Sequence, residues 1–295
     1  MITDAQWTEL LRQRAAAPEL ITDAYASRQA RPLLAPDGST FIVAADHPAR
    51  RAVGVGDDPL AMADRRSLLD RLVTALDNPG VDGVMATPDV LDELALLGVL
   101  DNKVVIGSMN RGGLQGSAWE LDDQLTGHDV ASIVKQRLDG GKMLLRINPA
   151  DPNCRRTIET CARLVSELAD AGLVAMIEPL PYTTIDGRAQ LHKSDDELIR
   201  CVGVASALGN TSARTWLKLP STNQVEKVMA ATTLPALILG GAPGPDPSSA
   251  FDSWRRAMAV PNVRGLVVGR SLLYPSDGDV ESAVAVAAQI VHGGN

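Results

Sequence analysis

Short runs of apolar residues recur along the chain, separated by stretches in which apolar residues have a helical spacing. Most of these runs are almost continuously apolar, which is typical of parallel strands that are covered on both faces. In the stretches between them, apolar residues three and four positions apart predict helices that bury one face. The pattern therefore predicts eight strands, at residues 40–46, 81–87, 103–109, 142–148, 173–179, 215–220, 236–242 and 263–269.

Several of the predicted helices carry sequence signals at their ends. The helix at 87–100 opens with a Thr-Pro pair, and proline suits the first turn of a helix. The helix at 153–172 has one apolar face and ends at a glycine, the residue that often terminates a helix. Ser194 and Ser221 each precede a helical stretch, so both are predicted to be N-caps.

The regular alternation of strands and helices predicts an α/β fold, a (β/α)8 TIM barrel. We expect residues 1–295 to form a single barrel domain, because barrels often reach this length and no stretch has the character of a domain linker. Residues 1–39 precede the first strand and are predicted to be an N-terminal helical extension that flanks the barrel. A doubly wound sheet is the alternative, but no GxGxxG motif follows the first strand.

The composition is that of an ordinary globular protein, with 45% hydrophobic and 22% charged residues. The formal net charge of -8 argues against nucleic-acid binding as the main role, although it allows a local cationic pocket for an anionic ligand. No apolar run approaches the ~20 residues of a membrane span, and the N-terminus lacks the apolar core of a signal peptide. We therefore expect a cytoplasmic protein that binds neither nucleic acid nor membrane.

Cysteine and histidine spacings indicate neither a disulfide framework nor a zinc site. The three cysteines lack CxxC spacing and are expected to be buried, reduced thiols. The four histidines are far apart and form no HxH or HExxH motif. These residues therefore predict no metal site.

In a (β/α)8 barrel the active site lies at the carboxyl ends of the strands. Lys142 is expected to enter near the start of the fourth strand, on the same face as Arg146, because strand side chains alternate with a period of two. The charged or polar residues predicted at the carboxyl ends are Asp46 and His47 on the first strand, Arg146 and Asn148 on the fourth, Glu178 on the fifth and Lys218 on the sixth.

Lys218 lies in the apolar segment WLKLP of the sixth predicted strand. Its neighbours Leu217 and Leu219 are expected to face the helices, so that Lys218 faces the barrel interior. A buried amine near other cations has a lowered pKa and can attack a carbonyl carbon to form a Schiff base. The alternative is a lysine at a strand end whose amine reaches solvent or pairs with Glu178.

Glycines end the seventh and eighth predicted strands, where barrels frequently bind phosphate. Gly240 and Gly241 end the seventh strand, and Gly269 and Arg270 end the eighth. Glycine lets backbone N–H groups approach a phosphate, the short helix that follows adds its positive end, and Arg270 supplies charge. The Gly- and Pro-rich stretch 240–249 is therefore interpreted as a functional loop.

The segments that carry these residues resemble one enzyme superfamily. WLKLP, LPALILGGAP and VRGLVVGRSLL resemble the region from strand 6 to strand 8 of class I (Schiff-base) aldolases of the deoxyribose-phosphate, archaeal-type fructose-bisphosphate and tagatose-bisphosphate group. FIVAADHP resembles their first strand, and GKMLLRINPADP and MIEPLPY resemble strands 4 and 5 of the tagatose-bisphosphate branch. The likeness spans about residues 40–273 in layout. Within the group, the chain most resembles actinobacterial deoxyribose-phosphate aldolase-like (β/α)8 proteins of inositol-catabolism gene clusters.

The resemblance implies a class I aldolase, a carbon-carbon lyase, that acts on a phosphorylated sugar or sugar acid. Lys218 would form the Schiff base, and Asp46 and Glu178 would transfer protons or orient that lysine. Lys142 or Arg146 would lower the pKa of its amine by like charge. Neither a metal nor an organic cofactor is required, and we expect a homo-oligomer.

The resemblance also suggests a substrate, 2-deoxy-5-keto-gluconate 6-phosphate, with dihydroxyacetone phosphate and malonate semialdehyde as products. Deoxyribose 5-phosphate and hexose bisphosphates are the alternatives. The chain departs from the group at three places, which leave the substrate and the acid/base residue open. Pro48 replaces the glycine that usually follows the first-strand histidine, Arg146 occupies a position where a tyrosine or a second charged residue is expected, and Tyr182 is predicted to follow strand 5 instead of lying on it.

Two functions of other classes also remain open. The first is a metal-dependent barrel isomerase or lyase that uses Asp46, His47 and Glu178 as ligands. The second is a barrel that binds a sugar phosphate without catalysis. Retention of activity in EDTA would exclude the first, and a covalent adduct trapped on a lysine would exclude the second.

Overall fold

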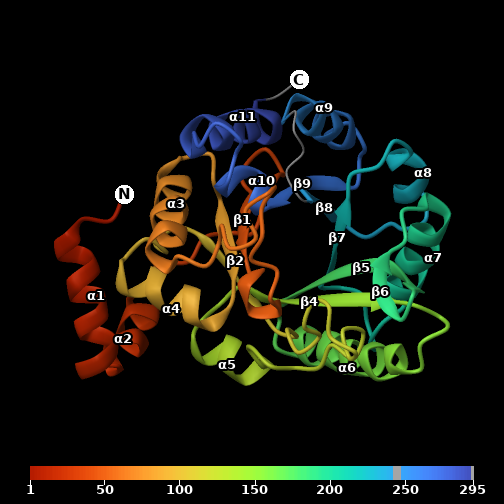
Figure 1. The fold of residues 1–295 in the computed structure, drawn as a ribbon, viewed down its shortest axis with the longest axis horizontal. Coiled ribbons are helices and arrows are strands. Elements are labelled where there is room, and N and C mark those ends of the chain that lie inside the picture. The colour runs from red at the N-terminus through yellow and green to blue at the C-terminus, as the bar shows by residue number, and fades with distance from the viewer. Residues whose placement is uncertain (242–246, 294–295) are drawn as a thin grey trace.

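The computed structural model describes residues 1–241 and 247–293. Its parallel strands form a closed barrel, because β4 pairs with β5 and so joins the two ends of the parallel sheet. Helices surround the strands (Figure 1). The predicted (β/α)8 TIM barrel is therefore confirmed. The eight barrel strands are β1 (Thr40–Ala45), β2 (Gly83–Ala86), β3 (Val104–Ser108), β4 (Gly140–Ile147), β5 (Val174–Ile185), β7 (Thr215–Pro220), β8 (Ala236–Leu239) and β9 (Val263–Val268).

Each barrel strand is followed by at least one helix before the next barrel strand or the end of the described chain. Aspartate or serine side chains cap several of these helices, which satisfies a free backbone N–H at each N-terminus. The helices are α1 (Asp4–Ala16), α2 (Glu19–Ser27), the 3-10 helix η1 (Pro48–Arg50), α3 (Arg65–Asp77), α4 (Pro88–Leu96), α5 (Val130–Lys135), α6 (Asn153–Asp170), α7 (Asp195–Ser206), α8 (Val225–Met229), α9 (Pro247–Met258), α10 (Arg270–Leu273) and α11 (Val280–His292).

Alternate residues of each strand face either the barrel interior or the surrounding helices. Leu217 and Leu219 lie in the outer core, as predicted. The next inward position toward the carboxyl end is polar on two strands. Asp46 lies two residues after Ala44, and Glu178 lies two residues after Met176. The inner core beneath this polar layer consists of Ile42, Ala44, Met85, Val104, Ile106, Val174, Met176, Leu237 and Val267.

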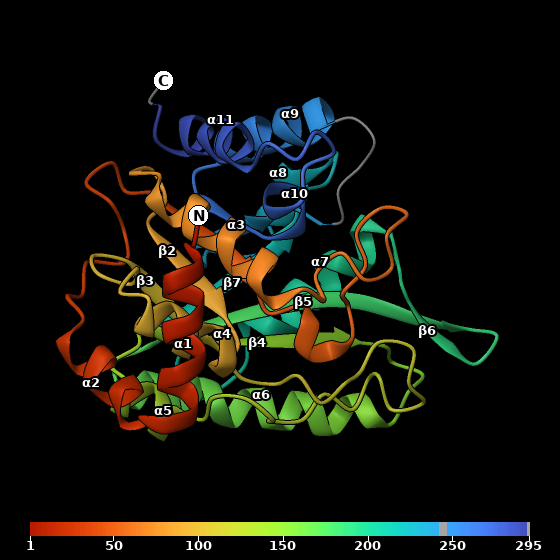
Figure 2. The ribbon, with the colours of Figure 1, turned by 60° about the vertical axis from the view of Figure 1, so that its left-hand side comes forward.

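The fifth barrel strand is longer than predicted and forms a hairpin. Residues 182–185 of β5 pair antiparallel with β6 (Arg188–Leu191), and this hairpin extends beyond the ring of helices (Figure 2). Tyr182 therefore lies on β5, and the prediction that it follows the strand is wrong. The two turn residues, Asp186 and Gly187, both have positive φ angles, of 50° and 74°. An Asp-Gly pair of this kind is a common signal for a two-residue hairpin turn.

One of the two predicted serine caps is also wrong. Ser194 accepts a hydrogen bond from the backbone N–H of Glu197 and caps α7 as predicted. Ser221 does not cap a helix, because α8 begins only at Val225 and the Ser221 hydroxyl is hydrogen-bonded to Ser253 of α9. The serine directly follows β7, so a tertiary contact replaces the local one.

The N-terminal helices pack against the outside of the barrel (Figure 1). The Tyr25 hydroxyl of α2 donates to Asp92 of α4 at 3.1 Å, and Arg28 donates to the backbone oxygen of Lys103 at 2.8 Å. Among the described residues, no helix has the length and apolar character that crossing a bilayer requires. The three cysteines are buried free thiols.

Candidate active site

Four of the predicted charged residues converge inside the barrel. Asp46, Lys142, Glu178 and Lys218 are each less than 10% exposed. Glu178 Oε2 lies 2.5 Å from Lys142 Nζ and 3.1 Å from Lys218 Nζ. Asp46 Oδ2 lies 3.3 Å from Lys142 Nζ. Lys142 therefore lies between two carboxylates, and Glu178 lies between two amines.

Lys142 lies near the start of β4, as expected, but it is level with the carboxyl end of the neighbouring strand, β3. It is the third residue of β4, and it pairs with Ser108, the last residue of β3. The strands of a closed barrel are staggered relative to one another. The stagger therefore brings Lys142 into the layer of Asp46 and Glu178, which the spacing along one strand could not reveal.

Arg111 belongs to the cluster, although the sequence prediction did not include it. This residue lies in the loop after β3, is 5% exposed, and places its Nη2 atom 2.9 Å from Asp46 Oδ2. Ser108 Oγ donates to the same oxygen at 3.0 Å. Because loops that follow barrel strands line the active site, the position of Arg111 shortly after β3 was the available signal.

The two carboxylates are ionised at neutral pH. Burial alone would raise the pKa of each, because the protein interior solvates a charge poorly. For Asp46, the charges of Arg111 and Lys142 outweigh burial and hold the pKa well below its usual range. For Glu178, Lys142 and Lys218 have the same effect and also lower the pKa. Both side chains are therefore available as charged acceptors of hydrogen bonds.

Lys142 has a pKa lowered from the ordinary value of 10.5 to about 8. Burial is the largest cause, and the positive charge of Arg111 is the second. The negative charges of Asp46 and Glu178 oppose this effect without cancelling it. An amine that titrates near neutrality is suited to carry a proton during a reaction.

The two lysines differ in how their amines are occupied. Lys142 contacts both Asp46 and Glu178. Lys218 Nζ has one hydrogen-bond or ion-pair partner within the described chain, Glu178 Oε2. Since an ammonium group has three N–H donors, Lys218 keeps more of its amine available to a ligand.

Arg146 contacts a different set of residues. Its guanidinium is fully buried, with Nη1 2.9 Å from Glu120 Oε1 and Nη2 2.9 Å from Asp123 Oδ2, both in the loop after β3. The cation that shares Asp46 with Lys142 is Arg111. The effect that was expected from Arg146 on the Lys218 amine stays a prediction.

The strand before the predicted glycine loop ends three residues earlier than expected, since residues 236–242 were predicted. β8 ends at Leu239, so Gly240 and Gly241 belong to the loop and not to the strand. Residues 242–246 of the predicted functional loop 240–249 lie outside the described residues, and α9 begins at Pro247.

Buried polar atoms surround the glycines. A Cβ atom on Gly240 would lie 2.4 Å from Ser271 Oγ, and one on Gly269 would lie 2.5 Å from the backbone oxygen of Ala44. Both positions therefore require glycine. Ser271 Oγ and Arg270 Nε are buried and have no hydrogen-bond partner among residues 1–241 and 247–293. Because buried donors are normally satisfied, these two are candidates for contact with a ligand.

His47 is held as a neutral imidazole beside Asp46. Its Nδ1 lies 3.9 Å from Asp46 Oδ1, and burial lowers the pKa of the imidazole well below 6.5 although Asp46 opposes this. In the part of the chain that the structure describes, no three His, Cys, Asp or Glu side chains gather as a metal-binding group. The geometry therefore does not favour Asp46, His47 and Glu178 as metal ligands.

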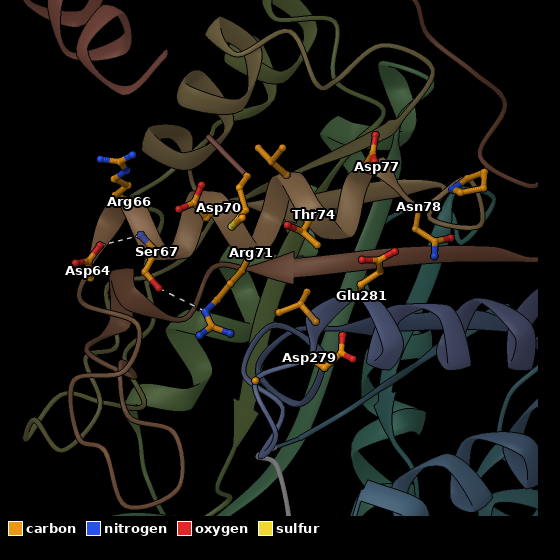
Figure 3. Close-up of a pocket in the computed structure, with 15 residues that line it drawn as sticks. Asp64, Arg66, Ser67, Asp70, Arg71, Thr74, Asp77, Asn78, Asp279 and Glu281 are labelled. Atoms are coloured by element: carbon orange, nitrogen blue, oxygen red, sulfur yellow. Dashed lines mark hydrogen bonds between the residues drawn. The ribbon is translucent and has the colours of Figure 1, made fainter. Parts of the chain in front are cut away.

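A groove lies on the outer surface, away from these residues (Figure 3). It has a volume of about 1110 Å³ and is lined by polar residues of α3 and by the start of α11. Arg71 in this groove donates to the backbone oxygen of Leu273 at 2.7 Å and stacks on the ring of Tyr274. These contacts engage Arg71 in the packing of α3 against the end of α10.

Several solved structures share this fold. The Cgl0159 protein from Corynebacterium glutamicum is 48% identical, with a TM-score of 0.97 and an alignment that covers 99% of each chain. An archaeal fructose-1,6-bisphosphate aldolase, with its catalytic lysine bound to a carbinolamine intermediate, is 16% identical with a TM-score of 0.66, covering 92% of this chain and 99% of that one. A fructose-bisphosphate aldolase from Slackia heliotrinireducens is 14% identical with a TM-score of 0.65, covering 96% and 88%. The two aldolases are similar to this chain in fold.

Sequence comparison assigns the chain to a family. A search of the curated proteins returned no match. A family model described as Cgl0159-like matches residues 38–288, which include all strands of the barrel. The chain therefore belongs to the Cgl0159-like family.

Proposed function

We propose that this chain is a class I aldolase that forms a Schiff base at Lys218 and cleaves a carbon-carbon bond of a phosphorylated sugar or sugar acid. The observation that carries the proposal is the pair of buried amines on one carboxylate, with Glu178 Oε2 in contact with both Lys142 and Lys218. Asp46 adds a second ionised carboxylate to the group. A buried nucleophilic amine, a second amine that titrates near neutrality and two acceptors are the groups that imine chemistry requires.

Lys218 is the proposed nucleophile because its amine has fewer contacts than that of Lys142. In the first step, the neutral amine attacks the substrate carbonyl carbon, and the carbonyl oxygen takes up a proton to give a carbinolamine. Loss of water then gives an iminium ion. The archaeal aldolase of the same fold is described with its catalytic lysine bound to a carbinolamine, which supports the same step here.

Bond cleavage follows from the electron demand of the iminium ion. A base removes the proton from the hydroxyl group on the carbon two positions from the iminium carbon. The carbon-carbon bond next to that hydroxyl breaks, an aldehyde leaves, and the bonding electrons form an enamine. Protonation of the enamine carbon and hydrolysis of the resulting iminium ion release the second carbonyl product and regenerate the amine.

The proton-transfer roles follow from the charge states of the cluster. Asp46 and Glu178 have lowered pKa values, so they stay ionised and orient the amines. Lys142 has a pKa of about 8 and is therefore proposed as the group that delivers or removes a proton near neutral pH. Arg146 is proposed to support the site through the loop after β3.

The phosphate of the substrate is proposed to bind at Gly240, Gly241, Gly269 and Arg270. Two observations support this site. Neighbouring atoms leave no room for a side chain at Gly240 and Gly269, and Arg270 Nε has no hydrogen-bond partner among the described residues. Ser271 Oγ, beside Gly240, is added to this set for the same reason.

The first candidate substrate is 2-deoxy-5-keto-gluconate 6-phosphate. An imine at its fifth carbon would give dihydroxyacetone phosphate and malonate semialdehyde. Fructose 1,6-bisphosphate and deoxyribose 5-phosphate are the second and third candidates, since both carry a phosphate and a carbonyl group that can form an imine.

The test is a turnover assay with these three compounds, with release of the small carbonyl products measured by coupled dehydrogenases. We expect turnover of at least one compound, unaffected by EDTA and abolished by Lys218→Arg, since a guanidinium stays protonated and cannot form an imine. Activity that is lost in EDTA and restored by a divalent metal would support a metal-dependent enzyme instead. Phosphate-dependent binding of all three compounds without turnover would support a binding protein.

A further inference from the structure

The loop between β3 and α5 is organised around one side chain of the barrel wall. Residues 109–129 of this loop contain no regular helix or strand. Arg146 of β4 donates to Glu120 and Asp123, both at 2.9 Å, and to the backbone oxygen of Gly113 at 2.8 Å. A single guanidinium thus contacts the loop at three separate points.

The two carboxylates also bind the loop backbone with their second oxygens. Glu120 Oε2 accepts a hydrogen bond from Gly116 N at 2.7 Å, and Asp123 Oδ1 accepts one from Gly113 N at 2.9 Å. A Cβ atom on Gly113 would lie 2.2 Å from Arg146 Nη2, so the backbone passes directly against the guanidinium. The loop conformation therefore depends on a planar group that donates in two directions, which lysine does not provide.

Arg111 is the cation that this loop brings into the active site. It lies two residues before Gly113, and its backbone N–H donates to Thr126 of the same loop at 2.9 Å. Its Nη2 lies 2.9 Å from Asp46 Oδ2, the oxygen that Lys142 Nζ approaches at 3.3 Å. Arg111 Nε is buried without a hydrogen-bond partner in the described part of the chain. Few side-chain contacts therefore hold Arg111, and its position depends on the loop.

We propose that Arg146 is a positioning residue, which holds the loop after β3 in the conformation that places Arg111 against Asp46. Arg146 then affects the two amines through Arg111 and the loop, and does not touch the reacting atoms. The consequence for catalysis rests on the proposed aldolase function, whereas the consequence for the charge on Lys142 does not.

The measurable consequence is the protonation of Lys142. The charged groups that face its amine are Asp46 after β1, Arg111 in the loop after β3, Glu178 on β5 and Lys218 on β7, and the Cys161 thiol of α6 lies within electrostatic range. Arg111 is the strongest positive neighbour of Lys142 in this set. Displacement of Arg111 should therefore raise the pKa of Lys142.

The test variant is Arg146→Lys, which keeps the positive charge and removes the two-directional contact. The pKa of Lys142 is measured by NMR titration of the full chain labelled at its six lysines, with the signal assigned by its loss in Lys142→Met. We expect the pKa to rise from about 8 by about one pH unit. If catalysis is as proposed, the limb of the pH profile of kcat that Lys142 sets shifts to higher pH by the same amount.

Two comparisons separate this role from a general weakening of the fold. Arg156→Ala removes an exposed ion pair between α6 and Asp122 of the same loop, and it should leave the pKa of Lys142 unchanged. Arg111→Met should raise that pKa directly. In the Arg111→Met background, Arg146→Lys should then produce no further rise.

A second variant covers the case in which Arg146→Lys fails to fold. Glu120→Gln keeps the shape of the side chain and weakens its contact with Arg146. Loss of a negative charge would by itself lower the pKa of Lys142, whereas a displaced Arg111 would raise it, so the sign of the change is decisive.

A rise in the pKa of Lys142 supports the proposal. An unchanged or lowered pKa in Glu120→Gln or in Arg146→Lys, or additive shifts in the double variant, would overturn it. A rise without any aldolase activity would keep the positioning role and reject the proposed function alone.

Discussion

Replacement of Lys142 by methionine should stabilise the folded protein at neutral pH. The side chain is 1% exposed and carries a positive charge that burial and Arg111 disfavour. Methionine removes this charge and keeps most of the side-chain volume. Asp46 retains Arg111 at 2.9 Å, and Glu178 retains Lys218 at 3.1 Å. Neither buried carboxylate is left without a cation.

The magnitude follows from the pKa of Lys142, which is lowered from 10.5 to about 8. At about 1.4 kcal/mol for each pH unit, the charged amine destabilises the fold by about 3 kcal/mol. Below pH 8, both the folded and the unfolded chain bind the proton, and this penalty is complete. Between pH 8 and 10.5, the folded chain has lost the proton and the unfolded chain has not, so stability rises with pH and the penalty disappears.

Urea unfolding of wild type and Lys142→Met at pH 7 and pH 10 measures this effect. We expect the variant to be more stable by about 1 to 3 kcal/mol at pH 7, with the difference shrinking toward zero at pH 10. Lys227→Met is the control, because Lys227 is 55% exposed and its ion pair with Asp196 should contribute at most about 1 kcal/mol. A variant less stable than wild type at pH 7, or a difference independent of pH, would refute the reasoning.

Three further outcomes are expected. Gly240→Ala should raise KM for a phosphorylated substrate, because its Cβ would collide with Ser271 Oγ, and an unchanged KM would remove this residue from the phosphate site. Arg270→Met should raise KM at least tenfold for phosphorylated substrates and leave KM for their unphosphorylated analogues unchanged, and equal effects on both would contradict the assignment. His292→Gln should destabilise the fold by about 1 to 2 kcal/mol at pH 6 and less at pH 9.5 in urea titrations. Close contacts with the carboxylates of Asp82 and Asp37, at 3.0 and 2.7 Å, raise the pKa of His292 to about 9. The stabilisation is therefore complete below pH 6.5 and is lost as pH rises through 9, and a loss of stability in the variant that grows with pH would contradict this.

The parts of the site that could be predicted from sequence depend on local periodicity. Asp46, Glu178 and Lys218 lie at inward positions near the ends of apolar strands, and the two-residue alternation of a strand sets that orientation. The order of strands in a barrel then brings these ends together.

The remaining parts depend on relations between distant segments. The position of Lys142 along the barrel axis follows from the stagger of β4 against β3, which no sequence pattern within β4 encodes. Arg111 reaches Asp46 because the loop after β3 folds around Arg146, and the conformation of a long loop depends on such tertiary contacts. The hairpin of β5 and β6 has a local signal in the sequence, the Asp186-Gly187 pair at its turn.

The central claim is that Lys218 forms a covalent imine with a phosphorylated carbonyl compound. Incubation of the protein with dihydroxyacetone phosphate and borohydride, followed by peptide mass spectrometry, tests it most directly. The account predicts a reduced adduct on Lys218 in the wild type and in Lys142→Met, and none in Lys218→Arg. An adduct on Lys142, or turnover without an adduct on either lysine, would contradict it.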